Sequence, residues 1–307
     1  MFEHITVLKG EVVEALRVGR GGLFVDGTVG GGGHSEAILL AGEAAGVEVR
    51  LLGLDRDPEA LEAARVRLAP HGSRVELVQG NYRDLPVILS ERGLGAAAGL
   101  VVDAGVSSPQ LDVARRGFSF SQEGPLDMRM GPDAQTAAEI IDASDERQLA
   151  AILGRYGEVK GAMRVASRIK AAREAGRLET TSQLAALCGT RRRGERIHPA
   201  TQVFQALRIA ANDELGGLEA LVLSIPEVVA AGGRAAIISF HSLEDRIVKQ
   251  GVRWLSDPCS CPPGLPMCVC GAVAKVKSIG KLVRSTEAEV QQNPRSRSAR
   301  LRVAEVL

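Results

Sequence analysis

The stretch that decides the fold is Phe24-Val25-Asp26-Gly27-Thr28-Val29-Gly30-Gly31-Gly32-Gly33-His34-Ser35. A short apolar run ends in an acid, a glycine-rich turn follows, and an apolar-periodic segment begins after Ser35. This order predicts a strand, a tight loop and a helix. Glycine suits such a loop because a Cβ atom would clash wherever the backbone takes a positive φ or approaches a ligand closely.

A second apolar run, residues 49–54, ends in Asp55. An acid at this distance from a glycine turn can hydrogen-bond the ribose hydroxyls of a cofactor that contains adenosine. The alternative, a glycine-rich turn before an ordinary helix, is less favoured because Asp55 follows at the right spacing. A dinucleotide would place its pyrophosphate at the helix N-terminus, where Asp26 would repel it, whereas the same carboxylate can accept from an ammonium group. S-adenosylmethionine carries an ammonium, a sulfonium and a ribose but no phosphate, so charge favours this cofactor over NAD.

The pattern of strands and helices extends from this motif to residue 103. Strands are expected at residues 22–26, 49–55, 75–79 and 99–103, and helices at residues 35–45 and 58–68, the second beginning with a cap residue and a proline. Such alternation predicts a doubly wound, mainly parallel sheet, in which ligands bind at the carboxyl ends of the strands. Asp26, Asp55, Asn81-Tyr82 and Asp103 all fall at predicted strand ends, on one edge of the sheet.

The alternation stops after residue 111. Helices are expected at residues 135–141, 146–153, 161–175 and 182–188, with no convincing strand among them. It resumes with a helix at 199–222, a turn at 232–234, a strand at 235–240 and a helix at 243–254. We therefore expect a sheet domain formed by residues 1–111 and 198–307, with an all-helical domain, residues 112–197, inserted into it.

Composition and charge narrow the function classes. The chain has 307 residues, of which 45% are hydrophobic, enough for one or two domains with full cores. No apolar run approaches the roughly 18 residues that a membrane-spanning helix needs. The first residues lack the basic and apolar regions of a signal peptide, and the five cysteines are an odd number, so a cytoplasmic protein is expected.

The net charge of +1 hides a strong asymmetry. Residues 1–150 carry 14 Lys and Arg against 23 Asp and Glu, whereas residues 151–212 carry 12 against 4 and residues 275–302 carry 8 against 2. Two basic segments on an otherwise acidic chain indicate a surface for a polyanion such as nucleic acid. Arginine bias in a genome explains arginine over lysine, but it does not explain the clustering.

Four cysteines form the pattern Cys259-x-Cys261-x6-Cys268-x-Cys270. Four thiolates could hold a tetrahedral zinc ion, but structural sites usually space their ligands two to four residues apart. We therefore favour a reduced cysteine-rich loop with no metal ligand, and a core position for Cys188.

Two titratable residues are candidates for chemistry at the same edge. Asp103 follows a predicted strand and could accept a proton from an exocyclic amine, or contact the cofactor, although a helix cap is equally consistent. His241, followed by Glu244 and Asp245, could move a proton. The alternative to this proton-transfer role is that the segment is the N-terminus of a helix, capped by Ser242. His198 is expected to be structural or to face RNA.

Several motifs together resemble the RsmH (MraW) family. They are Asp26 to Ser35, Asp55-Arg56-Asp57-Pro58, Asp103 to Asp112, Arg116-Gly117-Phe118-Ser119-Phe120, Pro125-Leu126-Asp127-Met128-Arg129-Met130, Arg196 to Ile209, Ser239 to Arg246 and Asn293 to Arg302. The resemblance spans nearly the whole chain in the same order. Ala104 is one departure, since many members have a larger apolar residue there.

The resemblance implies the fold and the function of the family. It implies a Rossmann-like, class I S-adenosylmethionine-dependent methyltransferase sheet with an inserted helical domain. The methyl acceptor would be the exocyclic N4 of one cytidine in the decoding centre of bacterial 16S rRNA, and the partner 16S rRNA or the small ribosomal subunit. The cofactor contacts would fall on these residues: Gly32, Gly33, His34, Asp55, Asp103 and Gln110, with Tyr82 near the adenine.

From these patterns we expect Asp103 and His241 as the catalytic candidates. Phe118, Phe120 and Phe204 are candidate walls for a base splayed out of folded RNA. Two alternatives stay open: a methyltransferase acting on another nucleic acid or on a small amine, and a non-catalytic RNA-binding module. The sequence does not determine the oligomeric state.

Overall fold

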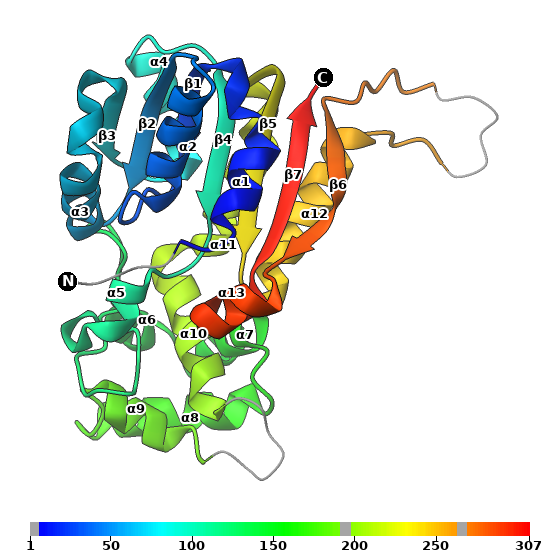
Figure 1. Ribbon diagram of the computed structural model, residues 1–307. Coiled ribbons are helices and arrows are strands. Elements are labelled where there is room, and N and C mark those ends of the chain that lie inside the picture. Colours follow the sequence, from blue (N-terminus) through cyan, green and yellow to red (C-terminus); the bar gives the residue numbers. More distant parts are fainter. Residues whose placement is uncertain (1–5, 191–197, 263–268) are drawn as a thin grey trace. The chain divides into compact units, whose positions relative to one another are not determined.

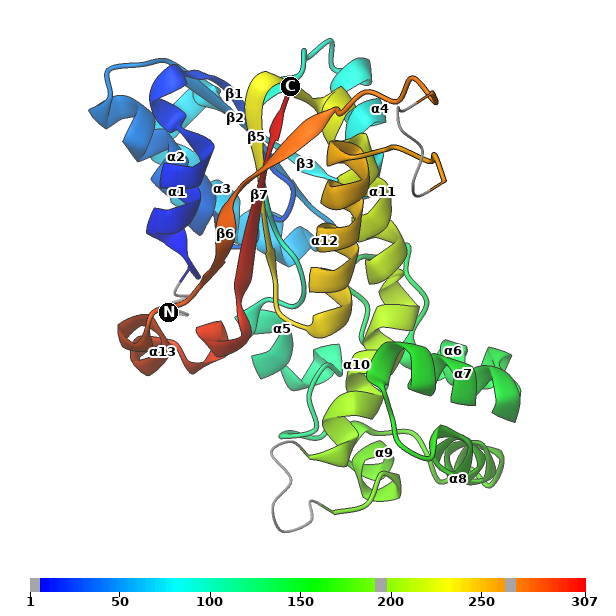
Figure 2. The same ribbon diagram turned by 90° about the vertical axis from the view of Figure 1, so that its right-hand side faces the viewer.

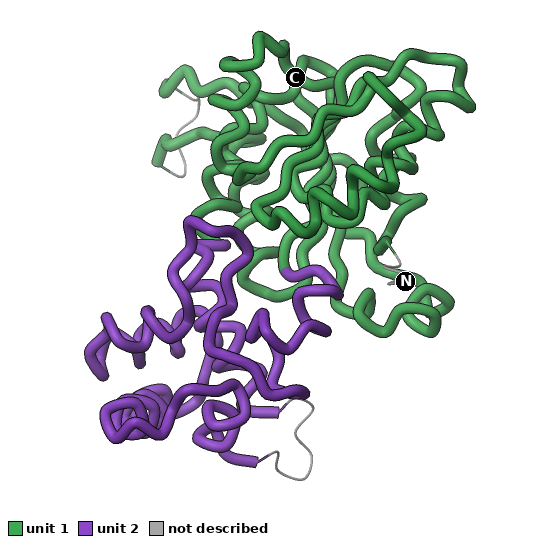
Figure 3. Tube along the Cα trace, turned by 90° about the vertical axis from the view of Figure 1, so that its left-hand side faces the viewer, with its two compact units in different colours: residues 1, 3–105, 215–307 green, residues 2, 106–214 purple. Residues whose placement is uncertain are grey.

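The computed structural model describes residues 6–190, 198–262 and 269–307. Arg196, Ile197 and Cys268, which belong to motifs named above, lie outside the described residues. The chain divides into two compact units, one running up to Gly105 and from Leu215 to Leu307, the other spanning Val106–Glu214 (Figure 3). No described helix is long and apolar enough to cross a membrane.

Within the described residues of the first unit, seven strands form one sheet in the order β3-β2-β1-β4-β5-β7-β6 (Figure 1). The strands are β1 (Gly22–Asp26), β2 (Val49–Asp55), β3 (Val75–Gln79), β4 (Ala97–Asp103), β5 (Val229–Ser239), β6 (Val276–Arg284) and β7 (Arg300–Val306). The first five run parallel, whereas β7 pairs antiparallel with both β5 and β6. This confirms the predicted α/β sheet.

Helices cover both faces of the sheet (Figure 2). One face packs against α1 (Lys9–Leu16), α2 (Gly33–Ala44) and α3 (Pro58–Leu68), and the other against α4 (Leu85–Glu91), α11 (Glu214–Val228) and α12 (Ser242–Ser256). The short helix α13 (Glu287–Gln292) precedes β7. Short 3-10 turns occupy Val18–Arg20, Ala69–Arg74, Tyr82–Asp84, Ala114–Arg116 and Pro294–Ser298. Because both faces are buried, the central strands are continuous apolar runs, which made them easy to predict.

Several predicted boundaries were wrong for local reasons. The turn expected at residues 232–234 lies inside β5, where Gly232 takes a φ of 77° and the pairing with β4 shifts register. The helix expected at 199–222 is broken at Asp213, whose φ of 47° lies in the left-handed region. The edge strand β6 and the helix α4 were missed. The lysines and Gly280 of β6 give it little apolar alternation, which is common for an edge strand.

The second unit is helical in the part that the structure describes. Its helices are α5 (Ser108–Asp112), α6 (Ala137–Ala143), α7 (Glu146–Gly157), α8 (Ala162–Glu174), α9 (Thr181–Leu187) and α10 (Pro199–Asn212). The predicted boundaries at 111/112 and 197/198 differ from the observed division after Gly105 and Glu214. The reason is that α10 buries Val203, Phe204 and Leu207 in the core of this unit rather than against the sheet.

Candidate functional site

Three carboxylates end adjacent parallel strands of the first unit. Asp26, Asp55 and Asp103 are the last residues of β1, β2 and β4, and β1 pairs with both of the other strands. Parallel strands place their carboxyl ends on one edge of the sheet, so these acids share the edge at which ligands of such folds bind.

Asp26 organises the glycine loop. It is 1% exposed, accepts a hydrogen bond from the Ser35 hydroxyl at 2.7 Å and another from the Thr28 amide at 3.2 Å. Burial raises the pKa of Asp26 to about 6, against the effect of these hydrogen bonds. The sequence suggested that this carboxylate receives an ammonium group. Each of its oxygens accepts one hydrogen bond, one from the loop and one from the start of α2, and contact with an ammonium group stays a prediction.

Three loop glycines are required by close neighbours. A Cβ on Gly27 would lie 2.8 Å from Cγ2 of Val102, and one on Gly33 would lie 1.8 Å from the hydroxyl oxygen of Thr6. Gly32, the N-cap of α2, has a φ of 80°. A side chain at any of the three would therefore displace the loop or strain its backbone.

Asp55 ties β2 to the loop and keeps acceptor capacity. Its Oδ2 accepts from the Gly30 amide and its Oδ1 from the Asp57 amide, both at 2.9 Å. Burial raises the pKa of Asp55 to about 6. Because each carboxylate oxygen can accept two hydrogen bonds, one lone pair on each remains for ribose hydroxyls.

Asp103 has the least compensated carboxylate of the three. Its amide donates to the Thr28 hydroxyl at 2.7 Å, but its buried Oδ1 has no hydrogen-bond partner among the described residues. Burial, followed by the charges of Asp26 and Glu244, holds the pKa of Asp103 well above its usual range. A buried, unsatisfied acceptor of this kind is costly unless a ligand donates to it.

Glu244 was not among the predicted site residues, although its charge acts on Asp103. It is 1% exposed, and its Oε2 accepts from the amides of Phe240 and His241 at 2.8 and 3.2 Å. Its Oε1 would lie 3.8 Å from a Cβ on Gly105. The capping-box spacing of His241 and Glu244 was the available sequence signal.

His241 is the N-cap of α12. The segment therefore begins a helix, as the alternative interpretation of the sequence expected, but the cap is His241 rather than Ser242. Its Nδ1 accepts from the Glu244 amide at 3.4 Å. Its buried Nε2 lies 2.9 Å from Oε1 of Glu244 but makes no hydrogen bond with a described residue. A proton-transfer role for His241 stays a prediction.

His34 and Tyr82 were both predicted to contact the cofactor, and the structure uses them differently. The buried His34 ring places Nε2 2.9 Å from the Val7 carbonyl, and burial lowers the pKa of His34 to about 4. Its ring thus anchors α2 to the chain before α1. Tyr82 is half-buried, with its Cβ 3.1 Å from the place of a Cβ on Gly27. Its ring packs against the core beside α11, with Cε2 3.6 Å from the place of a Cβ on Gly217, and its contact with the adenine stays a prediction.

The remaining predicted contacts belong to the second unit. Gln110 is 7% exposed, and its side chain accepts from the Ser107 amide in the capping box of α5. Phe118 and Phe204 are 6% and 4% exposed and belong to the core, whereas Phe120 is half-buried and contacts the rings of His198 and Phe204. The His198 Nδ1 caps α10, which makes it structural.

The acids of the first unit fit a cofactor that brings positive charge and hydroxyl donors. The raised pKa values of Asp26, Asp55 and Asp103 mean that their ionised forms lack compensation, and a cation would supply it. The unpartnered Oδ1 of Asp103 requires a donor. A pyrophosphate would add repulsion to the same groups, so the structure supports the preference for S-adenosylmethionine over NAD.

Three features together define the class of protein as a methyltransferase with a Rossmann-like sheet. They are the glycine loop after β1, the acids at the ends of β1, β2 and β4, and the antiparallel β7 beside β5. The whole chain, residues 1–307, matches the MraW methylase family, and the protein belongs to that family. Its methyl donor is S-adenosylmethionine, which the acidic site fits.

Relatives of high similarity cover the full chain. "Ribosomal RNA small subunit methyltransferase H" of Anaeromyxobacter sp. (strain K) is 51% identical over 311 residues, covering 100% of this chain and 98% of the relative. The protein of the same name from Myxococcus xanthus (strain DK1622) is 50% identical over 307 residues, with coverage of 100% and 98%. A solved rRNA methylase from Streptococcus thermophilus is 11% identical, with a TM-score of 0.42 and coverage of 97% and 93%.

Proposed function

We propose that this protein transfers a methyl group from S-adenosylmethionine to the exocyclic N4 of a cytidine in the decoding centre of bacterial 16S rRNA. Full-length relatives at about half identity, named as small-subunit rRNA methyltransferases, support the RNA substrate. The single observation that carries the chemistry is the buried, unpartnered Oδ1 of Asp103 at the acidic edge. We infer that the protein works in the cytoplasm, where ribosomal subunits are assembled.

The residues of the first unit divide the work of holding the cofactor. Asp55 would accept the ribose hydroxyls, and Tyr82 would lie against the adenine. Gly32 and Gly33 have no room for a side chain, and their bare backbone would let the cofactor approach the loop closely. We propose backbone contact for His34, because its ring is committed to Val7. Gln110 remains a proposed contact from the second unit.

Asp103 is the proposed catalytic residue. When bound, S-adenosylmethionine supplies a methyl group on a positively charged sulfur, open to attack by an amine nitrogen. An exocyclic amine is a weak nucleophile, so its lone pair must be aimed and its proton must leave. Asp103 can accept a hydrogen bond from the amine, orient it and then take the proton. His241 would act on this proton only if its ring turned away from Glu244.

The basic segment of the second unit supplies a candidate RNA surface. Among the described residues of the segment 151–212, five exposed basic residues lie on or beside α7 and α8: Arg155, Lys160, Arg164, Arg168 and Arg177. Arg173 and Arg208, by contrast, are paired with Asp142 and Glu214. The exposed residues, rather than every arginine of the segment, would therefore contact phosphate, with an affinity that depends on salt.

The deciding experiment incubates the protein with radiolabelled S-adenosylmethionine and small ribosomal subunits from a strain that lacks this methylation. Nucleosides from the digested RNA are then separated. Label in N4-methylcytidine is expected. No label on subunits or on naked RNA, with cofactor binding intact, would point to another methyl acceptor or to the RNA-binding alternative.

A further inference from the structure

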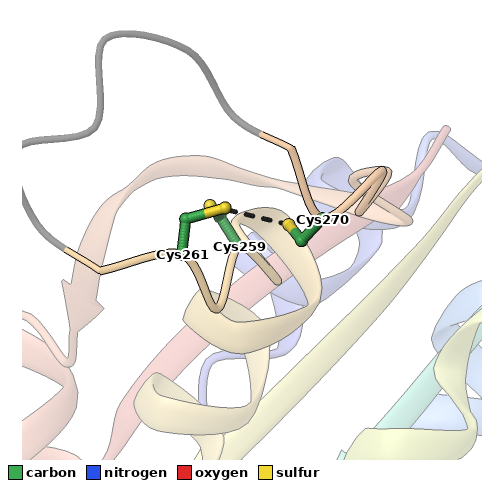
Figure 4. Close-up of side chains that lie close together, drawn as sticks. All are labelled: Cys259, Cys261 and Cys270. Carbon is green, nitrogen blue, oxygen red and sulfur yellow. Dashed lines mark hydrogen bonds between the residues drawn. The ribbon is translucent and has the colours of Figure 1, made fainter.

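The segment between α12 and β6 carries three described cysteines that the methyltransferase site does not use. Cys259 and Cys261 follow α12, and Cys270 lies before β6 (Figure 4). Their sulfur atoms all lie within 4.8 Å of one another, and Sγ of Cys270 is 3.8 Å from Sγ of Cys259. The sequence favours a reduced loop because the C-x-C spacing is atypical of zinc sites. The structure brings the thiols together despite that spacing.

The separation between the sulfurs of Cys259 and Cys270 is the one that a tetrahedral zinc ion requires. Zinc–thiolate bonds are about 2.3 Å long, and at the tetrahedral angle two such sulfurs stand about 3.8 Å apart. The distance between Cys259 and Cys270 equals this value. Thiolates are soft ligands, which select zinc or copper(I) over magnesium or calcium.

The surroundings show why a metal would be useful here. The base of the segment is closed by the Lys275 amide, which donates to the Leu255 carbonyl at 2.8 Å. Beyond that base, the described residues from Cys259 to Val273 are exposed or half-buried, and Val269 and Val273 are 78% and 75% exposed. A segment whose described residues form neither secondary structure nor a core needs another source of order, and a structural metal supplies it in small folds.

We propose that Cys259, Cys261 and Cys270 bind a structural zinc ion that closes the segment between α12 and β6. Cys268 lies outside the described residues and is not assigned as a ligand. Binding requires the thiolate forms, so each cysteine releases its proton as the zinc–sulfur bond forms, and no oxidant or reductant is needed.

The test measures metal in the full-length protein, expressed without a metal-binding tag in zinc-replete cells and passed through a weak chelator. Mass spectrometry of the digested protein is expected to find about one zinc per chain. Cys259→Ser, Cys261→Ser and Cys270→Ser should each lower that content at least severalfold. Cys188→Ser is the matched control, because its half-buried thiol packs in the second unit and donates to the Leu184 carbonyl.

Two further readouts separate zinc binding from misfolding. S-adenosylmethionine affinity should be unchanged in the three variants, because none of these cysteines lies at the acidic edge. Cobalt added to the metal-free protein should produce a sulfur-to-cobalt charge-transfer band that the variants lose. Wild-type protein without zinc and without that band, or variants with unchanged zinc, would overturn the proposal. Iron bound in place of zinc would overturn it as well.

Discussion

At the scale of single residues, Asp103 differs from the other acids of the site. Asp26 and Asp55 use their carboxylates on the loop, whereas Asp103 keeps one buried oxygen without a partner among the described residues. Holding an unpaired buried acceptor costs about 1–3 kcal/mol in a folded protein. That cost is explained if the oxygen is reserved for a donor on the substrate or the cofactor.

We expect Asp103→Asn to lower kcat by roughly 10²–10⁴-fold, because the amide cannot take a proton from the amine. The measurement is label incorporation into small subunits at saturating cofactor. Asp84→Asn, the same chemical change at an exposed acid, is the control and should leave turnover unchanged. Near-normal turnover in Asp103→Asn would remove this residue from the proton-transfer role.

The raised pKa values predict that cofactor affinity rises with pH. Asp26 and Asp55 have pKa values of about 6, and the pKa of Asp103 is held well above its usual range by its own burial and by neighbouring charge. A bound cation favours the ionised acids, so binding releases protons and strengthens as pH increases through these values. Calorimetry between pH 5 and 8 should show a steeper gain for S-adenosylmethionine than for S-adenosylhomocysteine, whose sulfur is neutral. Equal slopes would contradict this account.

At the scale of elements, the N-terminus of α12 links helix capping to the chemistry of the site. Glu244 closes the capping box with His241 and is also one of the charges that raise the pKa of Asp103. One carboxylate therefore serves both the helix start and the electrostatics of the neighbouring strand end. A capping glutamate on the surface would serve only the first.

Glu244→Gln separates these two effects. The amide keeps an oxygen for the Phe240 and His241 amides but removes the charge, so the pKa of Asp103 should fall. If Asp103 must be ionised for turnover, the acid limb of the kcat–pH profile should then move to lower pH. Glu139→Gln, in the exposed capping box of α6, is the control and should leave the profile in place. An unmoved limb in Glu244→Gln would exclude the coupling.

At the scale of the whole molecule, the basic charge of the sequence is only partly available to RNA. Arg173 is paired with Asp142 and Glu179, and Arg300 and Arg302 are both paired with Asp245. The net charge of a segment therefore overstates its capacity for phosphate. The exposed arginines of α8 indicate where RNA phosphate binds better than the total number of basic residues in the segment does.

Arg164 and Arg168 lie four residues apart, on one face of α8. Replacing both with alanine should weaken RNA binding and reduce the slope of log affinity against log salt by about 1.4–1.8, since each lost phosphate contact contributes about 0.7–0.9. Filter binding over a salt series measures both. Arg65→Ala with Arg92→Ala, two surface arginines of the first unit, is the matched control. Unchanged affinity and slope would place the RNA surface elsewhere.

The sequence by itself determined the central parallel strands of the sheet, the glycine loop and the acids at the sheet's edge. Buried parallel strands leave long apolar runs, and strand ends carry their polar residues at fixed positions, so local patterns were sufficient for β1, β2 and β4. Motif spacing likewise identified the family. Cofactor roles for residues such as Gln110 and His34 came from the resemblance alone.

Only the tertiary structure decided the details that depend on contacts between distant segments. It showed that α10 packs in the second unit and that the His34 ring hydrogen-bonds the Val7 carbonyl. It placed Glu244 where its charge raises the pKa of Asp103. It also brought Cys270 to Cys259 despite an unfavourable spacing. Such contacts join residues far apart in the chain, and their distances follow from packing, which no local pattern in the sequence encodes.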